Sequence, residues 1–427
     1  MSTSAPSVVL VVCDSLRPDL VDARTAPTLA RLRDEAAFYL FFRGVFPSTT
    51  RTSAASIATG CLPARHGLLG NTMVLDEGDG LSCLSAGRPD FFERLRRATG
   101  RALGRPTLAE RVSALGPAIV MSNVSPGAAY AHDPEGAGFV YHRAGSFGPG
   151  RSVQADGLQI AVGAQGDAQM TQRFCAALEQ RSPPLAVLWL SEPDHTGHHF
   201  PLGSPEHRRA IGAADQCVAR VLQTIDRLDP SQQRILCAVC SDHGMETVRQ
   251  RVDIAARLVQ AGWKAAPDSS ELVVAPQGTS AILHFAPQAA ALVDRVACWL
   301  LKQDFVDRVF VGADLAALGL PAGGSLAIAL TLAGDDQVNE YGVAGRRDVA
   351  ENALGGESKP GNGQHGGLGR HEQRPFLALR GGGFEPGHRV EPASLVDLAP
   401  TFLRHLGLPA GGVDGMALST ARPGRNA

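Results

Sequence analysis

The segment Ser7-Val-Val-Leu-Val-Val-Cys-Asp14 is the clearest indication of how this chain folds. It is a short apolar run without alternation that ends in a carboxylate, which is typical of a strand buried in a parallel sheet. Leu185-Ala-Val-Leu-Trp-Leu190 and Ile235-Leu-Cys-Ala-Val-Cys240 have the same form. Ligands bind outside the carboxyl ends of such strands. The side chains that we therefore expect at one edge of one sheet are Asp14, Asp194, His198, Asp242 and His243.

With His365 from late in the chain, this edge would gather three carboxylates and three imidazoles. Carboxylate plus imidazole suits zinc, and manganese or iron are the alternatives. Thr50 precedes an expected helix over residues 52–58, so amides at a helix N-terminus are available there for phosphoryl oxygens. The sequence thus indicates a two-metal site for phosphoryl transfer.

Six short segments, spread over most of the chain, carry these polar residues in a fixed order. They are Val-Val-Cys-Asp14, Phe46-Pro-Ser-Thr-Thr50, His66-Gly-Leu-Leu-Gly-Asn71, Pro193-Asp-His-Thr-Gly-His198, Ser241-Asp-His-Gly-Met245 and Gln364-His-Gly366. In this order they resemble the alkaline phosphatase superfamily, and most closely its nucleotide pyrophosphatase/phosphodiesterase (type I phosphodiesterase) branch. The resemblance implies an alkaline-phosphatase-like three-layer α/β/α core with a mostly parallel sheet.

The resemblance also implies a role for each matching residue. One metal site would use Asp194, His198 and His365, and the other would use Asp14, Thr50, Asp242 and His243. Thr50 takes the place of the nucleophile, and Asn71 takes the place of the residue that holds a phosphoryl oxygen. The implied activity is two-zinc hydrolysis of phosphodiester or phosphoanhydride bonds through a phospho-threonine on Thr50.

Several residues near these positions leave alternatives open. His195, His198 and His199 compete for one role, and the four-residue step from Asp194 favours His198 if the segment turns helically. His371 is the alternative to His365, and His66 is expected to fix a loop. Arg51 is either a solvated residue of the first helical turn or a guanidinium on substrate oxygens or the leaving group. The relatives often carry an aromatic residue there, so Arg51 weakens a strict nucleotide interpretation.

The segment His365-Gly-Gly-Leu-Gly-Arg-His-Glu-Gln373 departs from the His-Gly-Tyr-Asp-Asn form common in the branch. It is similar to the phosphonoacetate hydrolases, so C–P bond hydrolysis is one alternative and phosphomonoester hydrolysis is another. Sulfatase chemistry is disfavoured, because Thr50 and Ala54 stand where that class has Cys or Ser and an Arg. The non-enzymatic alternative is a degenerate phosphate-binding protein.

The pattern of expected strands and helices predicts a discontinuous core and one insert. We expect the catalytic core over residues 1–245 and 365–420, an inserted α+β cap over 246–364, and a flexible tail over 421–427.

Composition narrows the expected partners and location. The net charge of −2 gives no indication of a nucleic-acid groove, so a small phosphoryl compound is the expected partner. No apolar stretch approaches the ~18 residues of a membrane span. The N-terminus carries no basic region, and the eight Cys lie mostly in apolar runs as reduced thiols would, so we expect a cytoplasmic protein. The sequence leaves the oligomeric state open.

Overall fold

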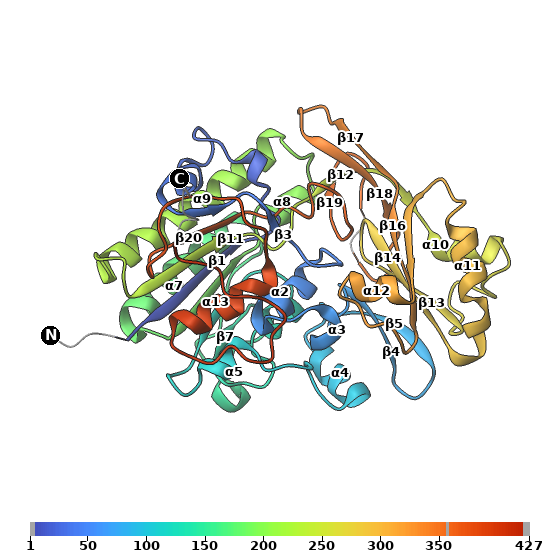
Figure 1. The fold of residues 1–427 in the computed structure, drawn as a ribbon, viewed down its shortest axis with the longest axis horizontal. Coiled ribbons are helices and arrows are strands. Elements are labelled where there is room, and N and C mark those ends of the chain that lie inside the picture. The colour runs from blue at the N-terminus through green and yellow to red at the C-terminus, as the bar shows by residue number, and fades with distance from the viewer. Residues whose placement is uncertain (1–4, 356–357, 422–427) are drawn as a thin grey trace, which may run out of the picture.

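A ten-stranded sheet forms the centre of the computed structural model, which describes residues 5–355 and 358–421 (Figure 1). Within those residues the strands, in sheet order, are β21 (Gly387–Arg389), β2 (Ala37–Tyr39), β20 (Leu377–Arg380), β11 (Ile235–Cys240), β1 (Ser7–Cys13), β10 (Leu185–Leu190), β6 (Ile119–Ser122), β7 (Phe139–Tyr141), β8 (Phe147–Gly148) and β9 (Ser152–Val153).

The three apolar runs are neighbouring parallel strands at the centre of this sheet. β1 lies between β10 and β11, with Cys13 opposite Leu190 and Val12 opposite Cys240. β6 and β7 continue the parallel part. β20, which the sequence predicts as a core strand over residues 375–379, pairs antiparallel to β11. The parallel registers bring the carboxyl ends of β1, β10 and β11 to one edge of the sheet.

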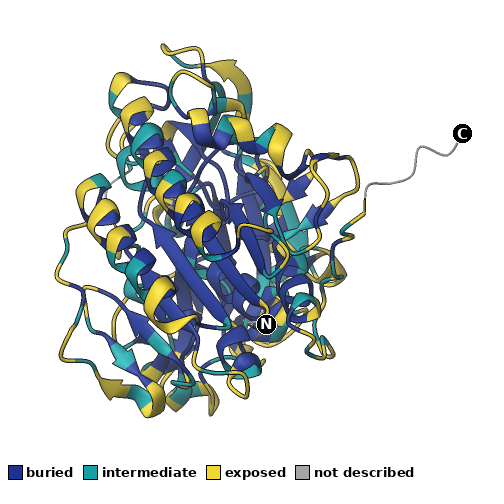
Figure 2. Cartoon of the chain, turned by 90° about the vertical axis from the view of Figure 1, so that its left-hand side faces the viewer, coloured by how far each residue is buried: buried dark blue, intermediate teal, exposed yellow. Residues whose placement is uncertain are grey.

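Helices cover both faces of the sheet, and the alternation within β1 shows how. Val8, Leu10 and Val12 belong to one hydrophobic core, whereas Val9 and Val11 belong to the other. The first core is closed by α2 (Thr50–Thr59), α6 (Pro126–Ala131) and α13 (Leu398–His405), and the second by α1 (Pro27–Glu35), α7 (Ala164–Arg181) and α9 (Pro205–Leu228). Figure 2 shows the buried strands behind helices that are exposed on their outer sides.

Smaller elements join these layers. They are β3 (Phe42–Arg43), α3 (Pro63–His66), β4 (Thr72–Asp76), β5 (Leu81–Ser85), α4 (Phe91–Thr99), α5 (Leu108–Val112), α8 (Asp194–Gly197) and β22 (Ala393–Ser394). α5 is shorter than the helix over 106–115 that the sequence predicts. The capping box at Thr107 begins it, and Gly116 with a φ of 141° follows it closely.

The expected insert leaves and rejoins the core through two paired strands, β12 (Glu246–Val252) and β19 (Gly363–Gln364). Its own hydrophobic core is built from residues between Val252 and Ala350. The insert comprises α10 (Ile254–Gln260), β13 (Leu272–Pro276), β14 (Ser280–Phe285), α11 (Val293–Leu300), β15 (Val306–Val311), α12 (Ala313–Ala317), β16 (Leu326–Leu332), β17 (Gly334–Val338) and β18 (Ala344–Ala350). It forms the right-hand part of Figure 1, and we keep the boundaries 246–364 as our interpretation.

Two predicted segments lie partly or almost wholly outside the described residues. The tail predicted over 421–427 lies outside them except for residue 421. The sequence also predicts a Gly-rich loop over 355–363, of which residues 356–357 lie outside the described residues. Among the described residues no helix is both long and apolar enough to cross a membrane.

Candidate functional site

The carboxyl ends of the three central strands deliver the candidate ligands to one place. Asp14 follows β1 directly, Asp242 and His243 follow β11, and Asp194 begins α8 after β10. The backbone N–H of Asp194 donates to the carbonyl of Asp14, so the β1 and β10 ends are tied together beyond the sheet. His365 joins them from the chain that returns from the insert.

Asp14, Asp242 and His243 form what we call the inner cluster, whose ligand atoms all lie within 4.8 Å of one another. His243 Nε2 lies 3.0 Å from Asp242 Oδ2 and 3.7 Å from Asp14 Oδ1. The side chains are 0–1% exposed. Thr50 Oγ1 lies 3.2 Å from the same His243 Nε2, so the hydroxyl faces the inner cluster from the first residue of α2.

Asp194, His198 and His365 form the outer cluster, again with ligand atoms within 4.8 Å. Nε2 of His198 and of His365 lie 3.4 Å and 3.6 Å from the two carboxylate oxygens of Asp194. The Asp194 side chain is 18% exposed and that of His198 is 30% exposed. The outer cluster is therefore open to solvent where the inner one is closed.

The two clusters are adjacent. The rings of His243 and His365 stack with centroids 3.7 Å apart. Ser15 Oγ donates to Asp194 Oδ1 over 3.0 Å and lies 3.0 Å from His243 Nδ1, so one hydroxyl contacts both clusters. The two clusters therefore form one continuous set of candidate metal ligands.

The carboxylates of the inner cluster have the properties expected of ligands for a metal cation. Asp14 Oδ1 and Asp242 Oδ2 are buried and form no hydrogen bond within the described residues. Burial, together with the charges of Asp242 and Asp194, raises the pKa of Asp14 well above its usual range. A bound cation would supply the missing partner and relieve the repulsion.

The imidazoles are oriented for coordination through Nε2. Nδ1 of His198 donates to the carbonyl of Gly363 over 3.2 Å, and Nδ1 of His365 donates to that of Ser48 over 2.8 Å. Nδ1 of His243 lies 3.1 Å from the carbonyl of Gly244. Such hydrogen bonds fix the tautomer and leave the other ring nitrogen for a metal.

The remaining histidines lie outside both clusters. His199 is exposed and its Nδ1 donates to the carbonyl of His195, whose ring packs against it at 4.8 Å. His371 accepts from Arg17 through Nδ1 and is not brought to Asp194. His66 fixes a loop, since its Nδ1 accepts from the N–H of Leu68.

Asn71 and Arg51 lie beside the Thr50 hydroxyl. Asn71 Oδ1 accepts from the backbone N–H of Arg51 over 3.3 Å, while its Nδ2 has no protein acceptor among the described residues. Arg51 Nε donates to Ser125 Oγ, and its Nη1 donates to the carbonyl of Asn71. Burial lowers the pKa of Arg51 to about 10 against the opposing charges of Asp194 and Asp14, so the guanidinium stays charged at neutral pH.

Glu372, the residue that holds the His365 loop, is not among the site residues predicted from the sequence. This fully buried carboxylate accepts from the backbone N–H groups of Gly366, Gly367 and Gly369 over 2.7–2.9 Å. It also accepts from Thr279 Oγ1 in the insert. Glu372 stands among glycine, arginine and histidine, and this local sequence does not indicate a buried carboxylate.

Gln277, in the β13–β14 turn of the insert, was missed as well. Its side chain accepts from the N–H of Asn71 over 2.7 Å and donates to the carbonyl of Thr72 over 2.6 Å. The partners are about 205 residues apart in sequence, so only the folded chain reveals the contact. The insert thus supports the backbone of Asn71 directly.

Comparison with known proteins identifies a family and similar folds. A family model described as type I phosphodiesterase / nucleotide pyrophosphatase matches residues 8–300. Ectonucleotide pyrophosphatase/phosphodiesterase family member 7 of Homo sapiens is 37% identical over 67 residues, which are 16% of this chain and 14% of that protein.

Solved structures are similar over nearly the whole chain. Murine ectonucleotide pyrophosphatase/phosphodiesterase 5 matches with a TM-score of 0.68 and 16% identity, covering 96% of this chain and 97% of that one. An inactive form of it in complex with AMP matches with a TM-score of 0.67, 16% identity and the same coverage. At this identity the likeness shows the fold, and it confirms the predicted α/β class. The match over residues 8–300 confirms the resemblance drawn from the six segments, and the chain belongs to the type I phosphodiesterase/nucleotide pyrophosphatase family.

Proposed function

We propose that this protein is a two-metal hydrolase of phosphodiester or phosphoanhydride bonds that forms a phospho-threonine on Thr50. Family membership supports a phosphodiester hydrolase. The observation that carries the finer proposal is the position of Thr50 Oγ1, 3.2 Å from His243 Nε2 and next to two clusters of candidate metal ligands.

The inner cluster and Thr50 would hold one metal ion, and the outer cluster would hold the second. Zinc suits the carboxylate and imidazole donors, with manganese or iron as alternatives. When bound, the ions supply Lewis acidity that favours ionisation of a coordinated hydroxyl and neutralises charge that develops on the substrate oxygens.

The chain's own residues would then act in order. Thr50 Oγ1 attacks phosphorus, so that an O–P bond forms to the protein and the bond to the leaving oxygen breaks. The unpaired Nδ2 of Asn71 and the amides at the start of α2 hold phosphoryl oxygens. Water then attacks phosphorus, releases the phosphorylated product and restores the Thr50 hydroxyl.

The test is to load the purified protein with zinc, to measure its metal content, and to follow release of nitrophenol from bis(4-nitrophenyl) phosphate. We expect two ions per chain and turnover. Because the chain belongs to a phosphodiesterase family, we expect a higher kcat/KM for this diester than for 4-nitrophenyl phosphate. A protein that binds two ions and hydrolyses neither ester would instead be the degenerate phosphate-binding protein.

A further inference from the structure

A cavity of about 540 Å³ opens beside the outer cluster and beside Arg51, the residue after Thr50. His198, His365, Asn71 and Arg51 form its inner wall. The rest of its lining is His199, Pro276, Gln277, Gly278, Ala350, Asn352, Gly355, Ser358, Lys359, Asn362 and Gln364. Among these described residues there is no Phe, Tyr or Trp on which a nucleobase would stack, and no Asp or Glu.

The lining contains two cations, Arg51 and Lys359. Neither forms an ion pair with any residue that the structure describes. Arg51 is held in place by Ser125 and Asn71, and its Nη2 packs so closely on Gly87 that a Cβ at that position would clash with it. A half-buried guanidinium fixed by neutral groups retains donors for an anion.

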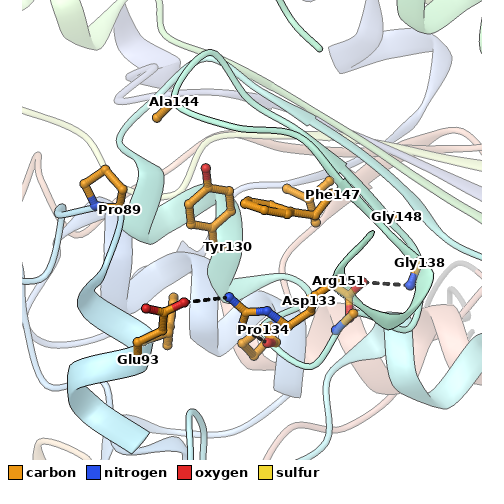
Figure 3. A pocket seen from close by; sticks show the side chains of 13 residues that line it. Pro89, Glu93, Tyr130, Asp133, Pro134, Gly138, Ala144, Phe147, Gly148 and Arg151 are labelled. Carbon is orange, nitrogen blue, oxygen red and sulfur yellow. Dashed lines mark hydrogen bonds and ion pairs between the residues drawn. The ribbon is translucent and has the colours of Figure 1, made fainter. Parts of the chain in front are cut away.

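A second cavity, of about 90 Å³ between α4 and the β7–β8 hairpin, shows the contrast (Figure 3). Its cation is Arg151, which forms an ion pair with Glu93 and donates to the carbonyl of Pro134. Tyr130 donates its hydroxyl to Gly145. Arg151 and Tyr130 are thus both paired with protein groups. The smaller cavity therefore offers no unpaired charge to a ligand.

We propose that the cavity beside Thr50 accepts an anionic substituent, a carboxylate or a phosphate, on the group that stays attached to the substrate's phosphorus. Arg51 is the specificity-determining residue, because it lies next to Asn71, the proposed holder of the phosphoryl oxygen. Lys359 contributes a second, exposed positive charge. The inference rests on the proposed diester or anhydride hydrolysis and names the class of substrate within it.

The test uses two diesters that share a leaving group, 4-nitrophenyl 3-carboxypropyl phosphate and 4-nitrophenyl butyl phosphate. The readout is the ratio of their kcat/KM values. Charge-assisted hydrogen bonds lead us to expect a ratio of about ten or more in favour of the carboxylate. Arg51→Gln should bring the ratio close to one, Arg51→Lys should keep part of it, and Lys359→Met should lower it less than Arg51→Gln does.

Lys302→Met, on an exposed lysine outside the cavity, is the matched control and should leave the ratio unchanged. A wild-type ratio of one or less overturns the inference. So does an Arg51→Gln protein that keeps the ratio but loses activity on 4-nitrophenyl phosphate, because Arg51 would then bind the phosphoryl group itself.

A binding measurement separates this inference from the proposed function. Calorimetry with the zinc-loaded protein compares 3-carboxypropylphosphonate with butylphosphonate, neither of which carries a leaving group. Tighter binding of the carboxylate that Arg51→Gln abolishes supports the inference even in a protein without turnover. Equal binding of both compounds overturns it even if the diesters are hydrolysed.

Discussion

The inner and outer clusters are similar in composition and different in construction. Asp14, Asp242 and His243 stand directly at the ends of two adjacent strands and are shielded from solvent. The outer cluster takes Asp194 and His198 from the short helix α8 and His365 from a loop that returns from the insert. The first depends on the central sheet alone, whereas the second depends on how the insert and that loop are held.

The electrostatics of the two clusters differ in the same way. Burial and like charges raise the pKa of Asp14. Burial acts in the same direction on Asp194, but His198 and His365 outweigh it and hold the pKa of Asp194 well below its usual range. The inner cluster therefore needs a cation to stabilise its charges, whereas the outer cluster is partly compensated by its own imidazoles. We infer that the inner site is the rigid one and that the outer site depends on its supports.

The largest expected effect separates chemistry from metal binding. Thr50→Ala should lower turnover by several orders of magnitude, because the nucleophile is lost. Both clusters keep their carboxylates and imidazoles, so metal content and thermal unfolding should stay close to those of the wild type. Activity on bis(4-nitrophenyl) phosphate within about tenfold of the wild type would contradict nucleophilic catalysis by Thr50.

Asp242→Asn tests the inner cluster. The amide keeps the shape but removes the charge that a metal ion and His243 require, so we expect a severe loss of activity and of one metal ion per chain. His195→Ala is the matched comparison, because His195 lies near Asp194 without joining either cluster. Equal damage from the two changes would mean that the choice of His198 over His195 is wrong.

Glu372→Gln tests whether the outer cluster depends on its support. The amide cannot accept all the backbone N–H bonds that the carboxylate receives, so the loop with His365 should loosen. We expect a loss of about 10–100-fold in affinity for one metal ion, measured by competition with a chelator. The second ion should be held as in the wild type.

The control for Glu372→Gln is Glu391→Gln, because Glu391 is exposed and lies outside the insert. Thermal unfolding of the metal-free proteins checks that the variant is folded. An equal loss of affinity for both ions would show that the two clusters do not differ as we infer.

Sequence predicted the part of the site that strands build. The apolar runs end where β1, β10 and β11 end, and parallel pairing then places Asp14, Asp194 and Asp242 together. The expected helix over 52–58 lies within α2, which begins at Thr50. The local pattern suffices for the strands because each is an uninterrupted apolar run that ends at polar residues.

The supports could not be predicted, because their partners are distant in sequence. Thr279 and Glu372 meet across 93 residues, and Gln277 reaches Asn71 across 206. Neither contact follows from local pattern or composition. The sequence left the choice between His365 and His371 open for the same reason. The loop held by Glu372 directs His365 toward Asp194, whereas His371 accepts a hydrogen bond from Arg17.

The smallest expected effect concerns stability on the Thr50 side of the site. His66 accepts from Leu68 N–H through Nδ1, and its Nε2 lies 3.0 Å from Ser56 Oγ in α2. Burial lowers the pKa of His66 to about 3, so the native state keeps it neutral while the unfolded chain, with a pKa near 6.5, takes up a proton as the pH falls. The contribution of His66 to the free energy of unfolding is thus complete above about pH 6.5 and declines toward pH 3, by about 2 kcal/mol between pH 7 and pH 5.

The test measures the free energy of unfolding in urea at pH 7 and at pH 5. His66→Gln should remove the part of the difference between the two pH values that His66 causes, while His388→Gln, at an exposed histidine, should not. If the free energy of unfolding of His66→Gln differed between pH 7 and pH 5 as much as that of the wild type, His66 would not stabilise α2 as a neutral imidazole.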